Sequence, residues 1–272
     1  MAWHRYVAVG DSFTEGVGDP GPDGGLVGWA DRLAVLLADA PGGVEYANLA
    51  IRGRLLRQVV DEQLPAALEL RPDLVSIVAG GNDLLRPGAD PDALAAVMED
   101  AVAALRAGGA DVLLATGVDP RATPLIARTR GRSAVYNAHL WSIAARHGAH
   151  VLDQWGAAWV QDARVWDVDR LHLAPEGHRR TALAAAAALG LDVDPAWAVP
   201  LDPAPPVPRR ERVATEAAWL RSFVVPWVGR RLRGRSSGDG RTAKRPVPTP
   251  VGPAQTEAAS GLAGSGAGLP NA

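Results

Sequence analysis

The chain has 272 residues and a formal net charge of −2 at pH 7, with 47% hydrophobic and 21% charged residues. This length is sufficient for one sizeable core and an extension, and the balanced charge does not require a strongly acidic or basic partner. Because the sequence contains no cysteine, disulfide bonds, thiolate catalysis and cysteine-ligated metal sites are excluded.

The sequence shows no signal for export or for membrane insertion. Residues 1–5 lead directly into a strand-like apolar run, without the charged, apolar and small-residue regions of a secretory signal. No apolar run approaches the roughly 18 residues of a membrane span. We therefore expect a soluble, cytoplasmic protein.

Five apolar runs rich in Val, Leu, Ile and Ala alternate with helix-like segments. Because these runs are continuous and do not alternate with polar residues, they are typical of a parallel sheet covered on both faces. The expected strands are residues 5–10, 44–50, 73–79, 110–116 and 149–153. The expected helices are residues 26–39, 54–70, 91–108, 133–147 and 175–189. This order predicts an α/β fold, a three-layer α/β/α sandwich with a five-stranded parallel sheet and right-handed crossovers.

The sequence after Pro195 differs in composition and in charge. Residues 1–203 hold 17 Arg and 26 acidic residues, whereas residues 204–272 hold 11 Arg or Lys and 4 acidic residues, so the net charge changes from −9 to +7. Closely spaced prolines up to residue 208 predict a stiff linker. Apolar residues at helical spacing among the arginines that follow predict an amphipathic helix. From residue 236 on, a composition dominated by Gly, Ser, Ala and Pro predicts disorder. The expected parts are a globular domain at 1–195, a Pro-rich linker at 196–208, a basic amphipathic helical segment at 209–235 and a disordered tail at 236–272.

A candidate nucleophile lies almost at the start of the chain. The apolar run Val7–Val9 leads into Gly10, Asp11 and Ser12. The Ser12 hydroxyl would therefore lie at the C-terminal edge of the sheet, where open α/β folds bind their ligands. A serine hydroxyl is a poor nucleophile at neutral pH, so it needs a base and donors for the oxyanion that it creates. The alternative for Ser12 is an N-cap of the segment that follows.

Three further segments could supply these groups. Asp169 stands three residues before His172, close enough on one turn for its carboxylate to orient the imidazole of a base. Gly53 follows the second expected strand, and Asn82 follows the third. For Gly53 the alternative is a turn that requires positive φ, and for Asn82 it is an ordinary turn residue.

In this order, the four segments resemble the SGNH/GDSL hydrolase family of serine esterases, over roughly residues 5–190. The matching blocks are Gly10-Asp11-Ser12, the glycine Gly53, Gly80-Gly81-Asn82-Asp83 and Asp169-Arg170-Leu171-His172. The resemblance implies a flavodoxin-like sheet and hydrolysis of an ester or thioester. It also implies that neither a metal ion nor an organic cofactor takes part.

The resemblance assigns a role to each block. Ser12, His172 and Asp169 would be the nucleophile, the general base and the residue that orients the base. The oxyanion would be held by the backbone N–H groups of Ser12 and Gly53 and by the side chain of Asn82. Asp167 is a rival of Asp169, His178 is expected to be a surface or packing residue, and Asp11 and Asp83 are expected to brace their loops.

We therefore expect a carboxylic ester hydrolase that cleaves small or medium acyl esters through an acyl-enzyme. Its expected partner is a small-molecule acyl ester and not nucleic acid, and the loops at 14–27, 84–90 and 117–132 would shape its pocket. The alternative is a non-catalytic binding or scaffold protein on the same fold that uses its basic C-terminal segment. Residues 209–235 could make a weak contact with a membrane surface or a protein; packing on the acidic domain is the simpler role.

Overall fold

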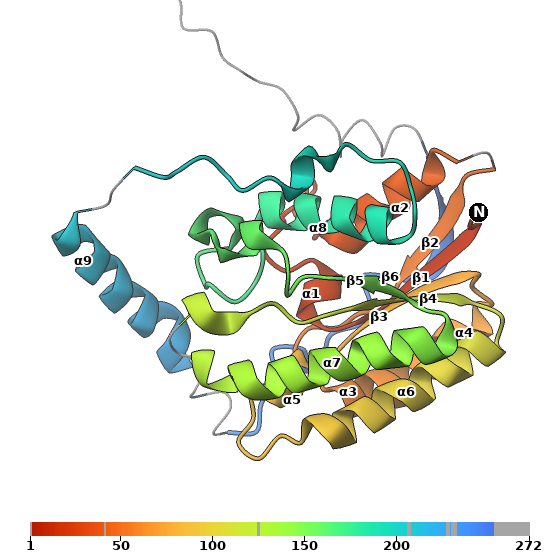
Figure 1. Ribbon diagram of the computed structural model, residues 1–272, viewed down its shortest axis with the longest axis horizontal. Helices are drawn as coiled ribbons and strands as arrows, with labels where there is room; N and C mark the ends of the chain where they lie inside the picture. The colour runs from red at the N-terminus through yellow and green to blue at the C-terminus, as the bar shows by residue number, and fades with distance from the viewer. Residues whose placement is uncertain are drawn as a thin grey trace, which may run out of the picture.

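A six-stranded sheet with helices on both faces forms the centre of the protein (Figure 1). The computed structural model describes residues 2–252 except 41, 124–125, 206–207, 227–228 and 230–232. The strand order is β5-β4-β3-β1-β2-β6. The strands are β1 (Arg5–Gly10), β2 (Val44–Asn48), β3 (Leu74–Val78), β4 (Asp111–Ala115), β5 (His150–Leu152) and β6 (Arg245–Val251).

The first five strands are parallel, as the sequence predicts. In the centre of the sheet, Tyr6 of β1 pairs with Tyr46 of β2 on one side and with Leu74 of β3 on the other. Each of these five strands lies within the range expected from its apolar run. The carboxyl ends of these strands therefore meet at one edge of the sheet, which is where an open α/β fold has its site.

The helices cover the sheet in two layers. In Figure 1, α2 (Trp29–Ala38) and α8 (Pro175–Ala188) lie above the sheet, and α6 (Pro91–Ala107) and α7 (Arg130–His147) lie below it. Short helices follow β1, β2 and β3, and a last helix follows the Pro-rich linker. They are α1 (Ser12–Glu15), α3 (Leu56–Gln58), α4 (Leu64–Glu69), α5 (Gly81–Leu84) and α9 (Arg209–Trp219). The three-layer arrangement predicted from the sequence is confirmed.

Alternate residues of the strands build two separate cores. Val7 and Val9 of β1 pack with α6 and α7 on one face, whereas Tyr6 and Ala8 pack with α2 and α8 on the other. All four side chains are fully buried. A strand buried on both faces is apolar at nearly every position, which explains the apolar runs in the sequence. The exception in β3 is the buried Ser76, whose hydroxyl is hydrogen-bonded to the Tyr6 hydroxyl at 2.7 Å.

The helix expected at 54–70 is interrupted. A π-helical turn at Val59–Gln63 separates α3 from α4. Pro65 lies at the start of α4, and proline has no N–H to donate to the carbonyl four residues earlier. The wider turn just before Pro65 accommodates this missing hydrogen bond.

The number of strands was predicted wrongly, because the tail expected to be disordered from residue 236 supplies a sixth strand. β6 pairs antiparallel with β2, with Val44 opposite Val251 and Tyr46 opposite Thr249. Prolines occupy alternate positions 246, 248 and 250. The backbone N–H and C=O groups of alternate residues in a strand point to opposite sides of that strand. The residues between the prolines can therefore pair with β2, while the prolines, which have no N–H, face the outer edge and protect it from further pairing. The rest of that tail, residues 253–272, lies outside the described residues.

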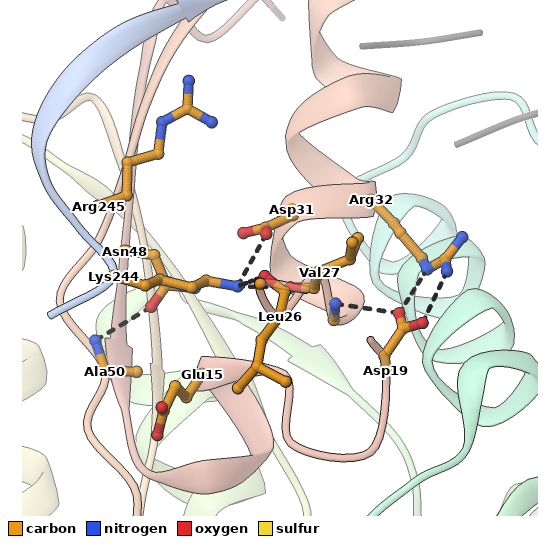
Figure 2. A network of polar contacts seen from close by, with 12 residues as sticks. Glu15, Asp19, Leu26, Val27, Asp31, Arg32, Asn48, Ala50, Lys244 and Arg245 are labelled. Atoms are coloured by element: carbon orange, nitrogen blue, oxygen red, sulfur yellow. Dashed lines mark hydrogen bonds and ion pairs between the residues drawn. The ribbon is translucent and has the colours of Figure 1, made fainter. Parts of the chain in front are cut away.

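The only lysine of the chain anchors the start of β6 (Figure 2). Lys244 Nζ lies 2.8 Å from Asp31 Oδ2 and also donates to the carbonyls of Leu26 and Val27. Asp31 accepts a second hydrogen bond, at 2.6 Å, from the Tyr46 hydroxyl of β2. A segment that begins more than 50 residues after the end of α8 is thus tied back to α2 and to the edge of the sheet.

The basic segment begins as a helix, as expected. α9 runs from Arg209 to Trp219 and continues into a π-helical turn at Leu220–Val224. Part of the expected segment, residues 227–228 and 230–232, lies outside the described residues. Within the part of the chain that the structure describes, no helix has the length and apolar character needed to span a bilayer.

Candidate active site

Ser12 lies immediately after β1, as the first residue of the short helix α1. The N-cap of α1 is Asp11, whose carboxylate accepts the Phe13 N–H at 3.1 Å. The alternative role of Ser12 as an N-cap is therefore wrong. The Ser12 side chain is only partly buried and lines a cavity at the carboxyl edge of the sheet.

Asp169 and His172 form a closed turn just before α8. His172 Nδ1 lies 2.5 Å from Asp169 Oδ2, while Asp169 Oδ1 accepts the backbone N–H groups of Leu171 and His172, each at 2.9 Å. Burial raises the pKa of Asp169, but the hydrogen bonds and charge of His172 outweigh it and hold that pKa below its usual value. Asp169 thus remains ionised and fixes the imidazole through Nδ1, which leaves Nε2 for a second partner.

Ser12 and His172 line the same two neighbouring cavities, which share several wall residues and are here called the smaller and the larger lobe of one cleft. The smaller lobe, about 210 Å³, is lined largely by apolar residues such as Phe13, Val118 and Tyr136. The larger lobe, about 520 Å³, is lined also by Gly53 and Asp169. Ser12, Asn82 and His172 line both lobes. Residues separated by 160 positions in the sequence therefore share one cleft.

Asn82 lies in α5, directly after β3, and its side chain is engaged. Asn82 Nδ2 donates to Asp11 Oδ2 and to the Arg54 carbonyl, both at 3.0 Å. The preceding Gly80 has φ of +103°, and a Cβ there would lie 2.9 Å from the Tyr136 ring. Only glycine fits this backbone and this space, so the turn that presents Asn82 depends on it.

Gly53 follows β2 and lines the larger lobe. Its φ of +74° is in the left-handed region, so the turn considered as the alternative for this glycine is present, and it is compatible with a role in the site. The preceding Arg52 is held by Glu15 of α1, which accepts the Arg52 backbone N–H at 2.7 Å and pairs with its guanidinium at 2.6 Å. This pair joins the Gly53 turn to the helix of Ser12, and no motif in the sequence predicts it.

Asp11 and Asp83 brace their loops, as predicted. Asp83 Oδ2 accepts the Leu56 N–H at 2.9 Å, and Asp11 binds both Phe13 and Asn82. Burial raises the pKa of Asp11 to about 6, although the Phe13 N–H and the nearby His172 act in the opposite direction. A buried carboxyl group with an altered pKa therefore lies beside the candidate base.

The remaining histidines in the core and on the helices have structural partners. His178 is fully buried between the Trp29 N–H and the Val17 carbonyl, and burial lowers its pKa to about 4. Its expected packing role is confirmed. His139 and His147 lie on α7, where they pair with Asp92 and Glu99 of α6, away from the cleft.

The walls of the cleft agree only in part with the loops expected from the sequence. Residues from the expected loops at 84–90 and 117–132 line it, whereas the loop at 14–27 contributes Val17. The sequence did not identify the contribution of the C-terminal segment. Trp219 and Phe223 line the larger lobe, together with residues 234–237 and 239. Their only sequence signal is the presence of aromatic residues among the arginines of residues 209–235.

A mostly parallel sheet between two layers of helices, with a serine and an Asp–His pair on one cleft at its carboxyl edge, is the arrangement found in serine hydrolases. The family model described as the GDSL-like lipase/acylhydrolase family matches residues 8–180. The chain belongs to this family, and it is accordingly a carboxylic ester hydrolase. No curated protein gave a significant match to the chain.

Several solved structures are similar to this chain. LAE5, an alpha/beta hydrolase enzyme from the metagenome of Lake Arreo, Spain, is 26% identical with a TM-score of 0.59, over 70% of this chain and 96% of that one. TesA is 27% identical with a TM-score of 0.57, over 68% of this chain and 98% of that one. Axe2, an acetylxylan esterase from Geobacillus stearothermophilus, is 20% identical with a TM-score of 0.59, over 70% and 96% respectively, and shares the fold.

Proposed function

We propose that the protein is a serine esterase that hydrolyses small or medium acyl esters through an acyl-enzyme intermediate. The proposal is supported by the cleft that Ser12 and His172 share and by the hydrogen bond between Asp169 and His172 Nδ1. The same three residue types in the same relative roles recur in serine hydrolases of unrelated folds.

In the first half-reaction, Ser12 Oγ attacks the acyl carbonyl while His172 Nε2 accepts the hydroxyl proton. The tetrahedral intermediate collapses, the bond to the alcohol oxygen breaks, and His172 returns the proton to the leaving alcohol. In the second half-reaction, a water molecule gives a proton to His172 and attacks the acyl carbon. The bond from that carbon to Ser12 Oγ then breaks, His172 returns the proton to Oγ, and the acid is released. Asp169 stabilises the imidazolium that forms in both steps.

The oxyanion of the intermediate would be held by the backbone N–H groups of Ser12 and Gly53 and by Asn82 Nδ2. Since Asn82 Nδ2 already donates to Asp11 and Arg54, it would exchange one of these acceptors for the oxyanion. The Arg54 carbonyl is the acceptor we expect to be released, because the bond to the Asp11 carboxylate is charge-assisted.

We assign the acyl group to the smaller lobe and the alcohol to the larger one. The smaller lobe has an apolar lining and a volume of about 210 Å³, below the roughly 300–1,000 Å³ of sites for drug-sized ligands. This size supports a small or medium acyl chain. The larger lobe is lined in part by polar side chains such as Gln58 and Ser237, which suits a polar alcohol.

We propose that the basic segment packs on the hydrolase domain and does not bind a membrane. In support, Arg170 pairs with Glu216 of α9 at 2.7 Å, and Trp219 donates to the Asp169 carbonyl at 2.9 Å. Salt-dependent binding to anionic vesicles that is lost on truncation at Pro208 would contradict this role.

The function is tested by turnover of p-nitrophenyl acetate and butyrate. We expect the purified protein to hydrolyse both esters and to show a burst of one p-nitrophenol per chain when deacylation is slow. Ser12→Ala should lose at least a thousandfold in rate. Equal rates for the two proteins would instead support the non-catalytic scaffold.

A further inference from the structure

α9 lies outside the family's domain but close to its active site. The family match ends at residue 180, whereas α9 begins at Arg209. Figure 1 shows α9 at the side of the molecule opposite the N-terminus, separated from α8 by a long connection. Its last residue, Trp219, and Phe223 of the π-helical turn that follows both line the larger lobe of the cleft. The sequence predicts that this segment packs on the acidic domain, but it does not indicate that the segment reaches the cleft.

The turn that carries Asp169 and His172 has an unfavourable backbone conformation. Arg170, between them, has φ of +58°, in the left-handed region that costs free energy for any residue with a Cβ. Part of this cost is offset by the two backbone N–H groups that Asp169 Oδ1 accepts. A strained turn at a functional site persists only where further contacts hold it.

Three contacts from α9 act on this turn. Trp219 Nε1 donates to the Asp169 carbonyl at 2.9 Å. The Arg170 guanidinium lies over the Trp219 ring, 4.7 Å from its centroid, and pairs with Glu216 Oε1 at 2.7 Å. The side chain of Arg170 is thus held between two residues one turn apart on α9, while the indole fixes the peptide group that precedes it.

We propose that Trp219 is a positioning residue for the Asp169–His172 pair, supplied by a segment that the family domain does not include. By holding the Asp169 carbonyl and the Arg170 side chain, Trp219 stabilises the turn conformation in which the Asp169 carboxylate meets His172 Nδ1. The proposal rests on the proposed function in one respect, since it takes Asp169 and His172 as the pair that activates Ser12.

The test is Trp219→Phe in the full chain, which keeps an aromatic ring beside Arg170 and removes the indole donor. Trp141→Phe is the matched control, because Trp141 is 49% exposed on α7 and does not line the cleft. Steady-state kinetics on p-nitrophenyl butyrate are measured for both. The second readout is the low-field proton resonance of the His172 Nδ1–H···Asp169 hydrogen bond by NMR, assigned by its loss in His172→Gln.

We expect Trp219→Phe to lower kcat roughly three- to tenfold and to change KM less than twofold. This is the effect of losing one hydrogen bond that helps to position the catalytic base. The low-field resonance should shift or broaden, and Trp141→Phe should match the wild type in both readouts. Glu216→Gln, which leaves the indole in place, should change both readouts in the same direction and by less.

Unchanged kcat and an unchanged low-field resonance in Trp219→Phe would overturn the proposal. Equal losses in Trp219→Phe and Trp141→Phe, together with equal falls in Tm, would also overturn it, because they would show a general effect on stability. If the wild type hydrolyses no ester, the proposed function fails, but the NMR comparison still decides whether Trp219 positions the pair.

Discussion

The side chain of Asn82 donates a hydrogen bond to the carboxylate of Asp11 at 3.0 Å. Asp11 follows β1 and Asn82 follows β3, so this bond joins the ends of two neighbouring strands next to Ser12. The Asp11 carboxylate also caps the helix that begins with Ser12. The candidate nucleophile and a candidate oxyanion donor are therefore fixed by the same buried carboxyl group.

Asn82→Ala should reduce kcat by about 10²- to 10³-fold while KM changes only a few fold, because the donor acts mainly on the charge of the intermediate. Kinetics on p-nitrophenyl butyrate measure this, with Ser12→Ala as the baseline. A loss below threefold, accompanied by a lower Tm, would show that Asn82 only braces the loop through Asp11.

Asp11 should make a measurable contribution to the pH dependence of stability. Its pKa is raised from 3.8 to about 6 in the folded protein, so the native state binds this proton more tightly than the unfolded chain does. The contribution of Asp11 to stability therefore increases as the pH falls from about 6 to about 4. Above pH 6 the ionised carboxylate costs about 3 kcal/mol relative to an unperturbed group.

Urea unfolding of the wild type and Asp11→Asn between pH 4 and pH 7.5 measures this contribution as a difference. Carboxyl groups with lowered pKa, such as Glu99 and Asp169, make the protein less stable as the pH falls. Because both variants contain these groups, their effect cancels when the two free energies of unfolding are subtracted. We expect the stability of the wild type relative to Asp11→Asn to rise on acidification through pH 6. A difference that is constant over this range would contradict the raised pKa.

The fold was predictable because its signals are local. Each buried parallel strand requires a largely apolar run, as in Leu74–Val78, where only Ser76 is polar, and the end of each run could be read within a few residues. The meeting of Ser12 with His172 could also be predicted. Parallel strands end at one edge, so groups placed after different strands, and in the loop before the last helix, converge there.

The parts that were not predicted depend on contacts between distant segments. The prolines at 246, 248 and 250 look like an extended linker, and they become a strand only because β2 offers a free edge and Asp31 binds Lys244. The position of Trp219 depends in the same way on the docking of α9. The positive φ of Arg170 could not be predicted, because no glycine stands at that position to indicate it.

Asp169 and its rival Asp167 can be separated by matched substitutions. Asp169→Asn should lower kcat by about 10³- to 10⁴-fold, since the amide cannot hold His172 in the tautomer that accepts the Ser12 proton. Asp167→Asn should keep kcat within a few fold, because His172 Nδ1 is bound by Asp169. Steady-state kinetics above pH 7 test this, and a larger loss in Asp167→Asn would reverse the assignment.

Lys244→Met should lower the free energy of unfolding by about 2 kcal/mol, because it leaves the largely buried Asp31 carboxylate without its cation. Burial raises the pKa of Asp31 even with Lys244 present, so the unpaired carboxylate is unfavourable. Urea unfolding of Lys244→Met, Asp31→Asn and the double variant forms a complete cycle. The double variant should lose less free energy of unfolding than the two single variants lose together. If the losses of the single variants simply add in the double variant, the ion pair contributes nothing to stability.

The assignment of the acyl group to the smaller lobe can be tested with two valine-to-alanine changes. Val118 lines only the smaller lobe and Val224 only the larger one. Removing two methyl groups from Val118 enlarges the acyl lobe, so Val118→Ala should move the preferred p-nitrophenyl ester towards a longer acyl chain. The added space changes kcat/KM for individual esters by about ten- to a hundredfold at most, the scale of one methylene in an apolar pocket.

Val224→Ala is the control: it should leave the acyl-chain profile unchanged and alter the preference among esters that share one acyl group but differ in their alcohol. If Val224→Ala shifts the acyl profile and Val118→Ala does not, the two lobes have the opposite roles, because each side chain contacts only the group bound in its own lobe.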